Sequence, residues 1–327
     1  MKAIVITKPG GAESLELLEV ERPEPRGEQV RVRVRAAGLN RADLMQARGS
    51  YPAPPGVPSN IPGLEFAGEV DALGPDVTGP IRIGDRVFGI VGGGGQAEYV
   101  LCHERMAVPI PSNLDFEQAA AVPEVFLTAH DALETQGGIK PGQRVLIHAV
   151  GSGVGSAALQ IAHTMGCQVF GTSRTAEKLE LAKELGLDVG IHSNTEDFAE
   201  AILRETGGEG VHVVIDHIGA PVLEGNLNAL STQGVLVVVG LLGGGSASVD
   251  LLQLLRKRIR LVGTTLRARP LEEKIAVTQC FAERVVPWLA RGLVRPIVDR
   301  VFGLDDFRAA QARLESNRGF GKVILRF

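Results

Sequence analysis

The chain has 327 residues, which is enough for two domains, and its 44% of hydrophobic residues is ordinary for a globular protein. Its net charge of -4 argues against nucleic acid and anionic membranes as main partners. The cysteines are few and far apart, a pattern typical of a reduced, intracellular chain without a disulfide framework: Cys102, Cys167 and Cys280. Because neither a signal-peptide pattern nor a run of about 18 uncharged apolar residues is present, we expect a cytoplasmic location.

Short β-strands set off by Gly, Pro and Asp are predicted in the first third of the chain. They cover residues 3–7, 29–38, 66–74 and 85–91. Val and Arg alternate in residues 30–36, which predicts one buried face and one solvent-exposed face that carries the arginines. Residues 52–63 hold five prolines and two glycines, so they must form a loop or a series of turns. A plain linker and a loop at the rim of a cleft are both open interpretations.

From residue 144 onward, predicted strands and helices alternate. The six strands cover residues 144–150, 168–173, 189–193, 211–218, 234–240 and 259–266. The five helices between them cover residues 155–166, 176–186, 197–205, 221–230 and 250–257. Several strands are continuously apolar, which is typical of a parallel sheet covered by helices on both faces. The pattern predicts an α/β fold with a doubly wound, six-stranded parallel sheet and right-handed crossovers.

The C-terminal part of the chain has no separate core of its own. Helices are predicted at residues 271–292 and 305–316, followed by a strand at 321–327. We expect this part to pack back on the N-terminal β region. The predicted domains are therefore residues 123–266, and a discontinuous domain made of residues 1–122 and 267–327.

A glycine-rich turn follows the first of the six strands. Residues 143–159 read QRVLIHAVGSGVGSAAL, with glycines spaced G-x-G-x-G at Gly151, Gly153 and Gly155. A dinucleotide pyrophosphate binds well at such a turn, because the helix N-terminus offers unpaired N–H groups and a positive dipole end. Ser152 stands where the strict G-x-G-x-x-G fingerprint has its middle Gly, and its hydroxyl can donate to a phosphate oxygen. The turn predicts a nucleotide site, since it lies in the strand–turn–helix context that the fingerprint requires.

The end of the second strand predicts which cofactor binds. NAD-selective proteins carry Asp or Glu here to bind the ribose hydroxyls. This chain instead reads GTSRTAEK over residues 171–178, with Thr172, Ser173 and Arg174 at the strand end and Lys178 one helical turn later. Such residues bind a 2′-phosphate through charge-assisted hydrogen bonds, whereas a carboxylate would repel it. We therefore expect NADPH to be preferred over NADH.

Several motifs together resemble a known family. They occupy residues 38–56, 63–70, 92–100, 121–133, 146–160 and 321–325 and span nearly the whole chain. The chain is similar to zinc-free medium-chain dehydrogenases/reductases of the NADPH:quinone oxidoreductase (zeta-crystallin-like) family, and within that family to the tumour-suppressor-inducible quinone oxidoreductases. The resemblance implies a GroES-like catalytic β domain, a Rossmann domain that binds NADP(H), and a cofactor in the cleft between the two.

The resemblance also implies site residues. Those around the nicotinamide end are Asn40, Asp43, Tyr51 and Thr128, of which the first three are the catalytic candidates. The pyrophosphate would be held by Ser152, Gly153 and Val154, and the 2′-phosphate by Ser173, Arg174 and Lys178. Further cofactor contacts are expected from Gly240, Leu241 and Leu242, and from Leu266, Asn317 and Lys322. Ser193 stands where relatives often have a Tyr that stacks on adenine, so that stacking is expected to be absent.

The ligands of a catalytic zinc ion are missing from their expected positions. Asn40 stands at the place of the first Cys ligand of zinc alcohol dehydrogenases, and Leu64 replaces the His of their GHE motif. No His precedes His103 and no Cys precedes Cys102, while Glu65 lacks ligand partners nearby in sequence. A zinc site needs three or four converging N, S or O ligands. We therefore expect no metal.

Without a Lewis acid, the favoured reaction is reduction of an electron-poor acceptor that takes up reducing equivalents once it is aligned. The resemblance implies an NADPH-dependent quinone oxidoreductase, with Tyr51 as a candidate proton donor or stacking group. An NADPH-dependent enoyl or enone reductase, and a low-turnover NADPH-binding protein with a structural or regulatory role, are the alternatives. One- and two-electron transfer both stay open.

Two smaller expectations concern assembly and packing. The strand within residues 258–265 is the last of its series, so it is predicted to lie at a sheet edge and to pair with a second copy in a homodimer. Three residues that could suggest other chemistry are expected to have structural roles: His148 as a hydrogen-bonded strand residue, Cys167 as an inert thiol, and Trp288 as core packing.

Overall fold

A computed structural model describes all 327 residues of the chain, which form two compact units. Unit 1 consists of Met1–Leu127, Leu266–Gly292 and Pro296–Phe327. Unit 2 consists of Thr128–Thr265 and Leu293–Arg295. The boundaries differ slightly from those predicted from sequence. Unit 1 also includes residues 123–127 and residue 266, and unit 2 also includes residues 293–295. None of the helices has the length and apolar character that crossing a membrane requires.

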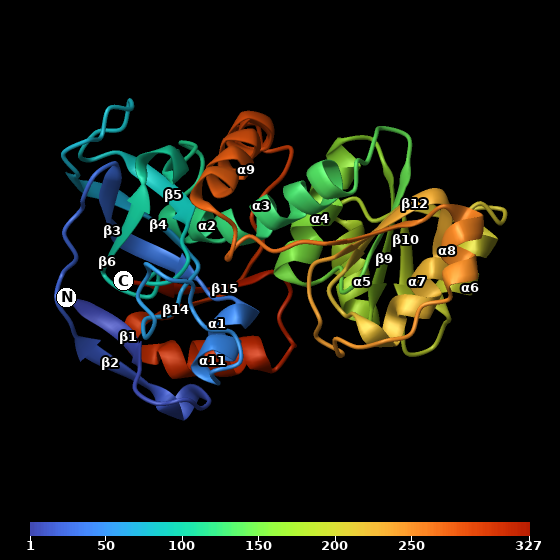
Figure 1. The fold of residues 1–327 in the computed structure, drawn as a ribbon, viewed down its shortest axis with the longest axis horizontal. Helices are drawn as coiled ribbons and strands as arrows, with labels where there is room; N and C mark the ends of the chain where they lie inside the picture. Colours follow the sequence, from blue (N-terminus) through green and yellow to red (C-terminus); the bar gives the residue numbers. More distant parts are fainter. The chain divides into compact units, whose positions relative to one another are not determined.

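Unit 2 is built on a six-stranded, fully parallel sheet (Figure 1), which confirms the predicted class. Its strands are β8 (Arg144–Ile147), β9 (Gln168–Ser173), β10 (Val189–His192), β11 (Val211–Asp216), β12 (Leu230–Val238) and β13 (Arg260–Gly263). Their order in space is β10-β9-β8-β11-β12-β13. The winding direction therefore reverses between β8 and β11, and open parallel sheets bind their ligands at the carboxyl ends of the strands beside such a reversal.

The helices of unit 2 alternate with its strands, as the apolar periodicity predicts. They are α4 (Gly153–Thr164), α5 (Ala176–Lys183), α6 (Phe198–Glu205), α7 (Leu223–Ala229) and α8 (Leu251–Lys257), with a 3₁₀ turn at Ala220–Val222. Helix α3 (Pro123–His130), whose residues up to Leu127 belong to unit 1, continues into a π-helical segment of unit 2, Asp131–Gln136. Side chains from neighbouring strands, among them Leu146, Phe170, Val214 and Leu236, form a core that stabilises the sheet.

Unit 1 contains two sheets made mostly of antiparallel strands. The smaller pairs β1 (Lys2–Ile6) with β2 (Leu15–Glu19), and β2 was not predicted. The larger has the order β14-β15-β3-β4-β5-β7, with β6 on β3. Its strands are β3 (Gln29–Gly38), β4 (Glu65–Leu73), β5 (Arg86–Ile90), β6 (Tyr99–His103), β7 (Val108–Pro109), β14 (Val298–Gly303) and β15 (Lys322–Arg326). Strand β15 pairs with β3, which confirms that the C-terminal part packs on the N-terminal β region.

Helices and short turns complete unit 1. The helices are α1 (Arg41–Ala47), α2 (Phe116–Ala120), α9 (Leu271–Arg284), α10 (Val286–Ala290) and α11 (Phe307–Glu315). The 3₁₀ turns are Ala12–Ser14, Glu104–Met106 and Leu304–Asp306. The single helix predicted at 271–292 is wrong, because the chain forms α9 and α10 separately, with Pro287 at the start of α10. Trp288 is only half-buried, whereas its neighbours Val285 and Leu289 form the packed face.

The prediction that the arginines of β3 are all exposed to solvent is also wrong. Arg33 is exposed, but Arg31 is buried. The Arg31 guanidinium donates to both carboxylate oxygens of Asp71, at 2.8 and 3.1 Å, and pairs with Glu24 at 2.8 Å. A bidentate carboxylate partner compensates the desolvation of the guanidinium, so alternation alone could not reveal its burial.

Candidate cofactor and acceptor site

The glycine-rich turn lies between β8 and α4 and begins the helix with a serine cap. The Ser152 hydroxyl oxygen accepts a hydrogen bond from the Gly155 N–H at 3.0 Å. A Cβ atom at position 155 would collide with the carbonyl oxygen of Ala149, so only glycine allows the turn to pass this close to the helix. The hydroxyl proton of Ser152 is not used by the cap, which leaves it able to donate to an anion.

The N-terminus of α4 has the features of an anion site. The helix has 12 residues, and its first turn carries no acidic side chain. Ser152 is exposed, and Gly153 and Val154 are partly exposed. Their backbone N–H groups and the helix dipole favour a bound phosphate at this position. These observations fit a dinucleotide pyrophosphate, which needs close backbone approach and several N–H donors.

The end of β9 presents hydroxyl and cationic side chains next to this turn. Ser173 is buried, and its hydroxyl oxygen accepts from the Thr175 N–H at 3.2 Å. Arg174 is exposed, and its carbonyl oxygen accepts from the Asn194 side-chain amide at 3.2 Å. Ser193 is exposed and donates its backbone N–H to the Ser173 carbonyl oxygen at 2.9 Å. The strand end therefore offers cationic and hydroxylic groups and no carboxylate, although Glu177 follows in the first turn of α5.

Other predicted cofactor residues are placed as follows. Gly240 follows β12 and donates its N–H to the Asp216 carbonyl oxygen at 3.2 Å, and the side chains of Leu241 and Leu242 after it are exposed. These lie at the same carboxyl edge of the sheet as the glycine turn. Thr128 is buried on α3. Lys178 is partly exposed in the first turn of α5.

Four predicted cofactor residues belong to unit 1, namely Asn40, Leu266, Asn317 and Lys322. Leu266 is buried. Asn317 adopts a left-handed backbone conformation with φ of 58° after α11, and its side-chain oxygen accepts from the Arg41 guanidinium. The contact of Leu266 and Asn317 with the cofactor stays a prediction.

His148 takes part in a buried network directly beneath the glycine turn. Its Nε2 lies 2.7 Å from the Asn226 amide oxygen, and its Nδ1 lies 2.9 Å from the Thr172 hydroxyl. Asn226 in turn donates to Asp216 at 3.0 Å. This pattern assigns the ring proton to Nε2, and burial lowers the pKa of His148. The neutral histidine joins β8, β9 and α7, which agrees with the structural role expected for it.

In unit 1, a buried ion pair holds the Asn40 side chain. The Lys322 ammonium lies 2.6 Å from a Glu65 carboxylate oxygen and donates to the Asn40 amide oxygen and the Leu39 carbonyl oxygen, both at 2.7 Å. The Asn40 amide nitrogen donates to Glu65 at 2.8 Å. Lys322 thus has three oxygen partners inside unit 1, so we do not include its ammonium in the proposed cofactor site.

Asp43, a catalytic candidate, is completely buried. Its carboxylate accepts from the N–H groups of Asn40 at 2.8 Å and Gly63 at 3.1 Å, and from the Gln96 amide at 3.1 Å. Burial raises the pKa of Asp43 to about 6, against the opposing effect of these donors. Its geometry supports a positioning role: Asp43 fixes the start of α1, where Asn40 lies, against the loop at Gly63.

Tyr51 begins the proline-rich loop, and an arginine holds it in place. The buried Arg267 guanidinium donates to the Tyr51 carbonyl oxygen at 3.1 Å and lies 5.0 Å from the centre of the Tyr51 ring. It also donates to the Gly92 carbonyl oxygen at 2.8 Å and to the Gln46 amide oxygen at 2.5 Å. Sequence reasoning missed Arg267, because nothing near it in sequence indicates these partners. The loop, which has no regular secondary structure, is thus fixed by side-chain donors.

Comparisons with known proteins agree with this two-part arrangement. The model described as "Alcohol dehydrogenase GroES-like domain" matches residues 26–112, and the one described as "Zinc-binding dehydrogenase" matches residues 153–283. A quinone oxidoreductase of Pseudomonas aeruginosa is 35% identical over 329 residues, covering 99% of each chain. The chain belongs to the quinone oxidoreductase family of medium-chain dehydrogenases/reductases. It is therefore an oxidoreductase of a family that uses a nicotinamide cofactor.

Solved structures of this quinone oxidoreductase family and its relatives have the same fold. The quinone oxidoreductase of Pseudomonas syringae pv. Tomato superposes with a TM-score of 0.90 at 32% identity, covering 100% of this chain and 99% of that one. The CurK enoyl reductase has a TM-score of 0.88 at 28% identity, with coverages of 99% and 98%. A mycobacterial protein complexed with NADPH has a TM-score of 0.89 at 28% identity, with coverages of 100% and 100%.

The donors of this family member do not fit zinc, although one matching description names it. The Asn40 amide is occupied by Lys322 and Glu65, and Leu64 is a buried hydrocarbon side chain. Among all 327 residues, no three His, Cys, Asp or Glu side chains are grouped so that they could hold a metal ion. A tetrahedral zinc site needs such a group, so no step below uses a metal.

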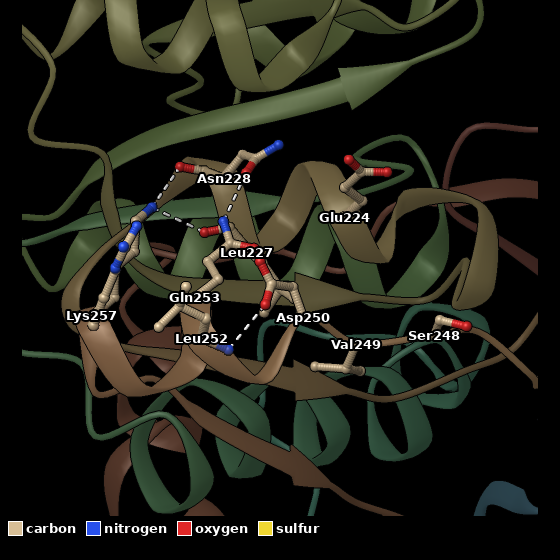
Figure 2. A pocket seen from close by; sticks show the side chains of 10 residues that line it. Glu224, Leu227, Asn228, Ser248, Val249, Asp250, Leu252, Gln253 and Lys257 are labelled. Carbon is tan, nitrogen blue, oxygen red and sulfur yellow. Dashed lines mark hydrogen bonds between the residues drawn. The ribbon is translucent and has the colours of Figure 1, made fainter.

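A separate groove of about 700 Å³ lies between α7, α8 and residues 248–250 of this quinone oxidoreductase family member (Figure 2). The Lys257 ammonium donates to the carbonyl oxygens of Leu227, Asn228 and Leu230 at 2.7–2.9 Å, and the Gln253 amide donates to the Asn228 side chain at 2.6 Å. These polar groups attach α8 to the C-terminal end of α7. The groove includes none of the predicted cofactor residues.

Proposed function

We propose that this protein is an NADPH-dependent quinone oxidoreductase that works without zinc. The 35% identity to a quinone oxidoreductase over nearly the whole of both chains is the observation that carries the proposal. Two features of unit 2 support the choice of cofactor: the N-terminus of α4, which offers unpaired N–H groups, and the carboxylate-free end of β9. A relative of the same fold forms a complex with NADPH.

In this proposal, unit 2 binds the cofactor through residues at the carboxyl edge of its sheet. The backbone at Ser152, Gly153 and Val154 holds the pyrophosphate. Ser173, Arg174 and Lys178 hold the 2′-phosphate through charge-assisted hydrogen bonds. Contacts toward the nicotinamide end come from Gly240, Leu241, Leu242 and Thr128. Ser193 offers no aromatic surface for adenine.

The acceptor side of the proposal belongs to unit 1. The bound nicotinamide supplies the hydride. Tyr51 is placed by Arg267 to stack on the acceptor or donate a proton to it, and Asn40 is held in one orientation by Lys322 and Glu65. The contribution of the protein is thus to orient the reactants and exclude water, which lowers the barrier for an acceptor that accepts hydride readily.

A second candidate is an NADPH-dependent enone or enoyl reductase. It is favoured by the similarity to the CurK enoyl reductase, whose fold is superimposable over nearly the whole chain. Both reactions use the same cofactor and the same hydride donor. They differ in the acceptor, which is a quinone ring in one case and a double bond conjugated to a carbonyl group in the other.

The test of the proposed function is stopped-flow oxidation of NADPH by EDTA-treated protein, with o-quinones, p-quinones and enones as acceptors. We expect kcat/KM for at least one quinone class to exceed that of every enone by about 10-fold or more, a difference of about 1.4 kcal/mol in transition-state stabilisation. The reverse order would favour the enone reductase. Stoichiometric NADPH binding without oxidation by any acceptor would instead favour a low-turnover binding protein.

We also propose a homodimer in which the sheet of unit 2 pairs with that of a second copy. Strand β13 is the last strand of the sheet and has β12 as its only neighbour. Nearby, Leu251 and Leu255 on α8 are each 73% exposed, and Leu261 on β13 is exposed too. Exposed strand edges and apolar groups of this kind favour association with a symmetry mate.

The Leu251→Glu, Leu255→Glu double variant tests this assembly. We expect light scattering at micromolar concentration to give a dimer mass for the wild type and a monomer mass for the variant, because two carboxylates would be desolvated at the interface. Leu18→Glu, which alters an exposed leucine of unit 1, serves as the control and should stay dimeric. A monomeric wild type would contradict the proposal.

A further inference from the structure

Three carboxyl groups of unit 1 converge on two cationic groups. Asp43, Glu65 and Glu124 lie close enough to interact electrostatically with one another and with Lys322 and Arg267. If all three carboxyls were ionised, the cluster would hold one more negative than positive charge in surroundings that are largely buried. Such an excess charge is costly at low dielectric constant, which favours one proton being retained within the cluster.

The hydrogen bonds indicate which carboxyl retains the proton. Glu65 accepts from the Lys322 ammonium, from the Asn40 amide and from the Glu124 backbone N–H at 2.6–2.8 Å. Asp43 accepts three N–H groups, which hold it as a carboxylate. The side chain of Glu124 accepts none of the hydrogen bonds found in the chain, so its negative charge is the least stabilised of the three.

Glu124 is also the member of the cluster that is not completely buried. Glu65 and Asp43 are completely buried, whereas Glu124 is only half-buried. It lies in the first turn of α3, one helical turn before Thr128, a residue expected near the nicotinamide. The charge of Arg267 acts on both Glu124 and Tyr51, which relates Glu124 to the acceptor side of the proposed site.

We propose that Glu124 is the proton donor to the reduced acceptor. This inference rests on the proposed function, since it concerns the same acceptor. Conversion of a quinone to a hydroquinone takes up one hydride and one proton. The hydride comes from the nicotinamide cofactor, the Glu124 O–H bond breaks, and an O–H bond forms on the acceptor oxygen. The Glu124 carboxylate then regains a proton from water, which balances the reaction.

The electrostatics of the cluster support this assignment. Burial, followed by the negative charges of Glu65 and Asp43, raises the pKa of Glu124 to about 8, while Lys322 and Arg267 oppose the shift. These four groups come from β4, α1, β15 and the segment before α9, and they are the charged groups that act on the Glu124 side chain. A carboxylic acid with such a pKa is protonated at neutral pH and suits general acid catalysis.

The first test uses the cofactor-free protein. Infrared difference spectra during a pH titration should show the carbonyl stretch of a protonated carboxylic acid that persists at pH 7 and disappears as the pH rises through about 8. Glu124→Gln should remove this band. Glu124→Asp, which keeps an acid, should retain a band at a changed midpoint. Glu283→Gln, which alters an exposed glutamate of α9, should leave it unchanged. A band that persists unchanged in Glu124→Gln would overturn the proposal.

The second test is the pH dependence of turnover with the best acceptor. In the wild type, kcat should fall as the pH rises through the pKa of Glu124, because the donor loses its proton. Glu124→Gln should lower kcat about 100-fold at pH 6 and remove this alkaline decline. A Glu124→Gln variant that keeps the wild-type profile, with the loss seen instead in Tyr51→Phe, would overturn the donor role.

The two tests separate failure of this inference from failure of the proposed function. If none of the acceptors tested supports oxidation of NADPH by the wild type, the proposed function fails and the donor role fails with it. The infrared band, which requires neither cofactor nor acceptor, would still show whether Glu124 holds the proton of the cluster. If the enzyme is active but the band does not depend on Glu124, only the inference fails.

Discussion

Replacing Ser173 by Asp lowers kcat/KM for NADPH by about 100-fold or more and leaves kcat/KM for NADH unchanged or higher, because charge-assisted hydrogen bonds are each worth about 1.5–3 kcal/mol. The new carboxylate would stand at the end of β9, where it removes a hydroxyl donor and repels a 2′-phosphate. It would also supply the acid that NAD-selective proteins use to bind the ribose hydroxyls. The expected result is thus a reversal of cofactor preference.

Steady-state kinetics with both cofactors measure this effect, and two further variants define its origin. Arg174→Ala should lower kcat/KM for NADPH by about 10-fold or more and leave kcat/KM for NADH unchanged. The reason is that Arg174 is exposed and its charge would bind only the 2′-phosphate. Ser316→Asp, at an exposed serine of unit 1, is the control for added negative charge and should alter neither cofactor. Equal kcat/KM values for NADPH and NADH in the wild type would contradict the assignment of the 2′-phosphate site.

Lys322→Met should lower the free energy of unfolding by about 3–5 kcal/mol, which is the usual cost of removing one partner of a buried ion pair. The side chains of Lys322 and Glu65 are 5% and 0% exposed. Methionine has a similar length, so the variant leaves no large cavity, but it leaves the Glu65 carboxylate without its cation and removes a donor from the Asn40 amide. Denaturant unfolding monitored by circular dichroism measures the loss.

An ion pair at the surface, with nearly the same distance between its charged atoms, provides the matched control. Lys183 and Glu180 are 2.7 Å apart, compared with 2.6 Å for Lys322 and Glu65, but their side chains are 53% and 69% exposed. Lys183→Met should therefore cost about 0–1 kcal/mol, because water screens and solvates both charges. Equal losses in the two variants at neutral pH would contradict the burial argument.

Much of unit 2 could be predicted from the sequence because its signals are local. The apolar runs of the strands, the helical periodicity between them and the G-x-G-x-G turn all depend on residues within one or two turns of each other. The absence of an acid after Ser173 is likewise visible in a short segment. The predicted boundaries were less accurate at the glycine-rich turn: the strand predicted at 144–150 ends at Ile147, and the turn that follows leads into α4.

Other predictions failed or were not made because they depend on distant partners. The burial of Arg31 requires Asp71, which β4 places next to it in the sheet. Glu65 has no partner nearby in sequence, so its ion pair with Lys322 of β15 was not predicted. The register explains their meeting: Ile324 of β15 lies opposite Gly38 of β3.

The sequence by itself determined the alternation of strands and helices, the helix N-terminus suited to a phosphate, and the absence of the usual zinc ligands. The tertiary structure alone decided the strand order, with its reversal between β8 and β11, and the convergence of Glu65, Lys322 and Glu124 from β4, β15 and α3. The physical reason is that hydrogen bonds within helices and turns join near neighbours, whereas a buried charge is tolerated only when strand pairing brings a compensating charge from elsewhere in the chain.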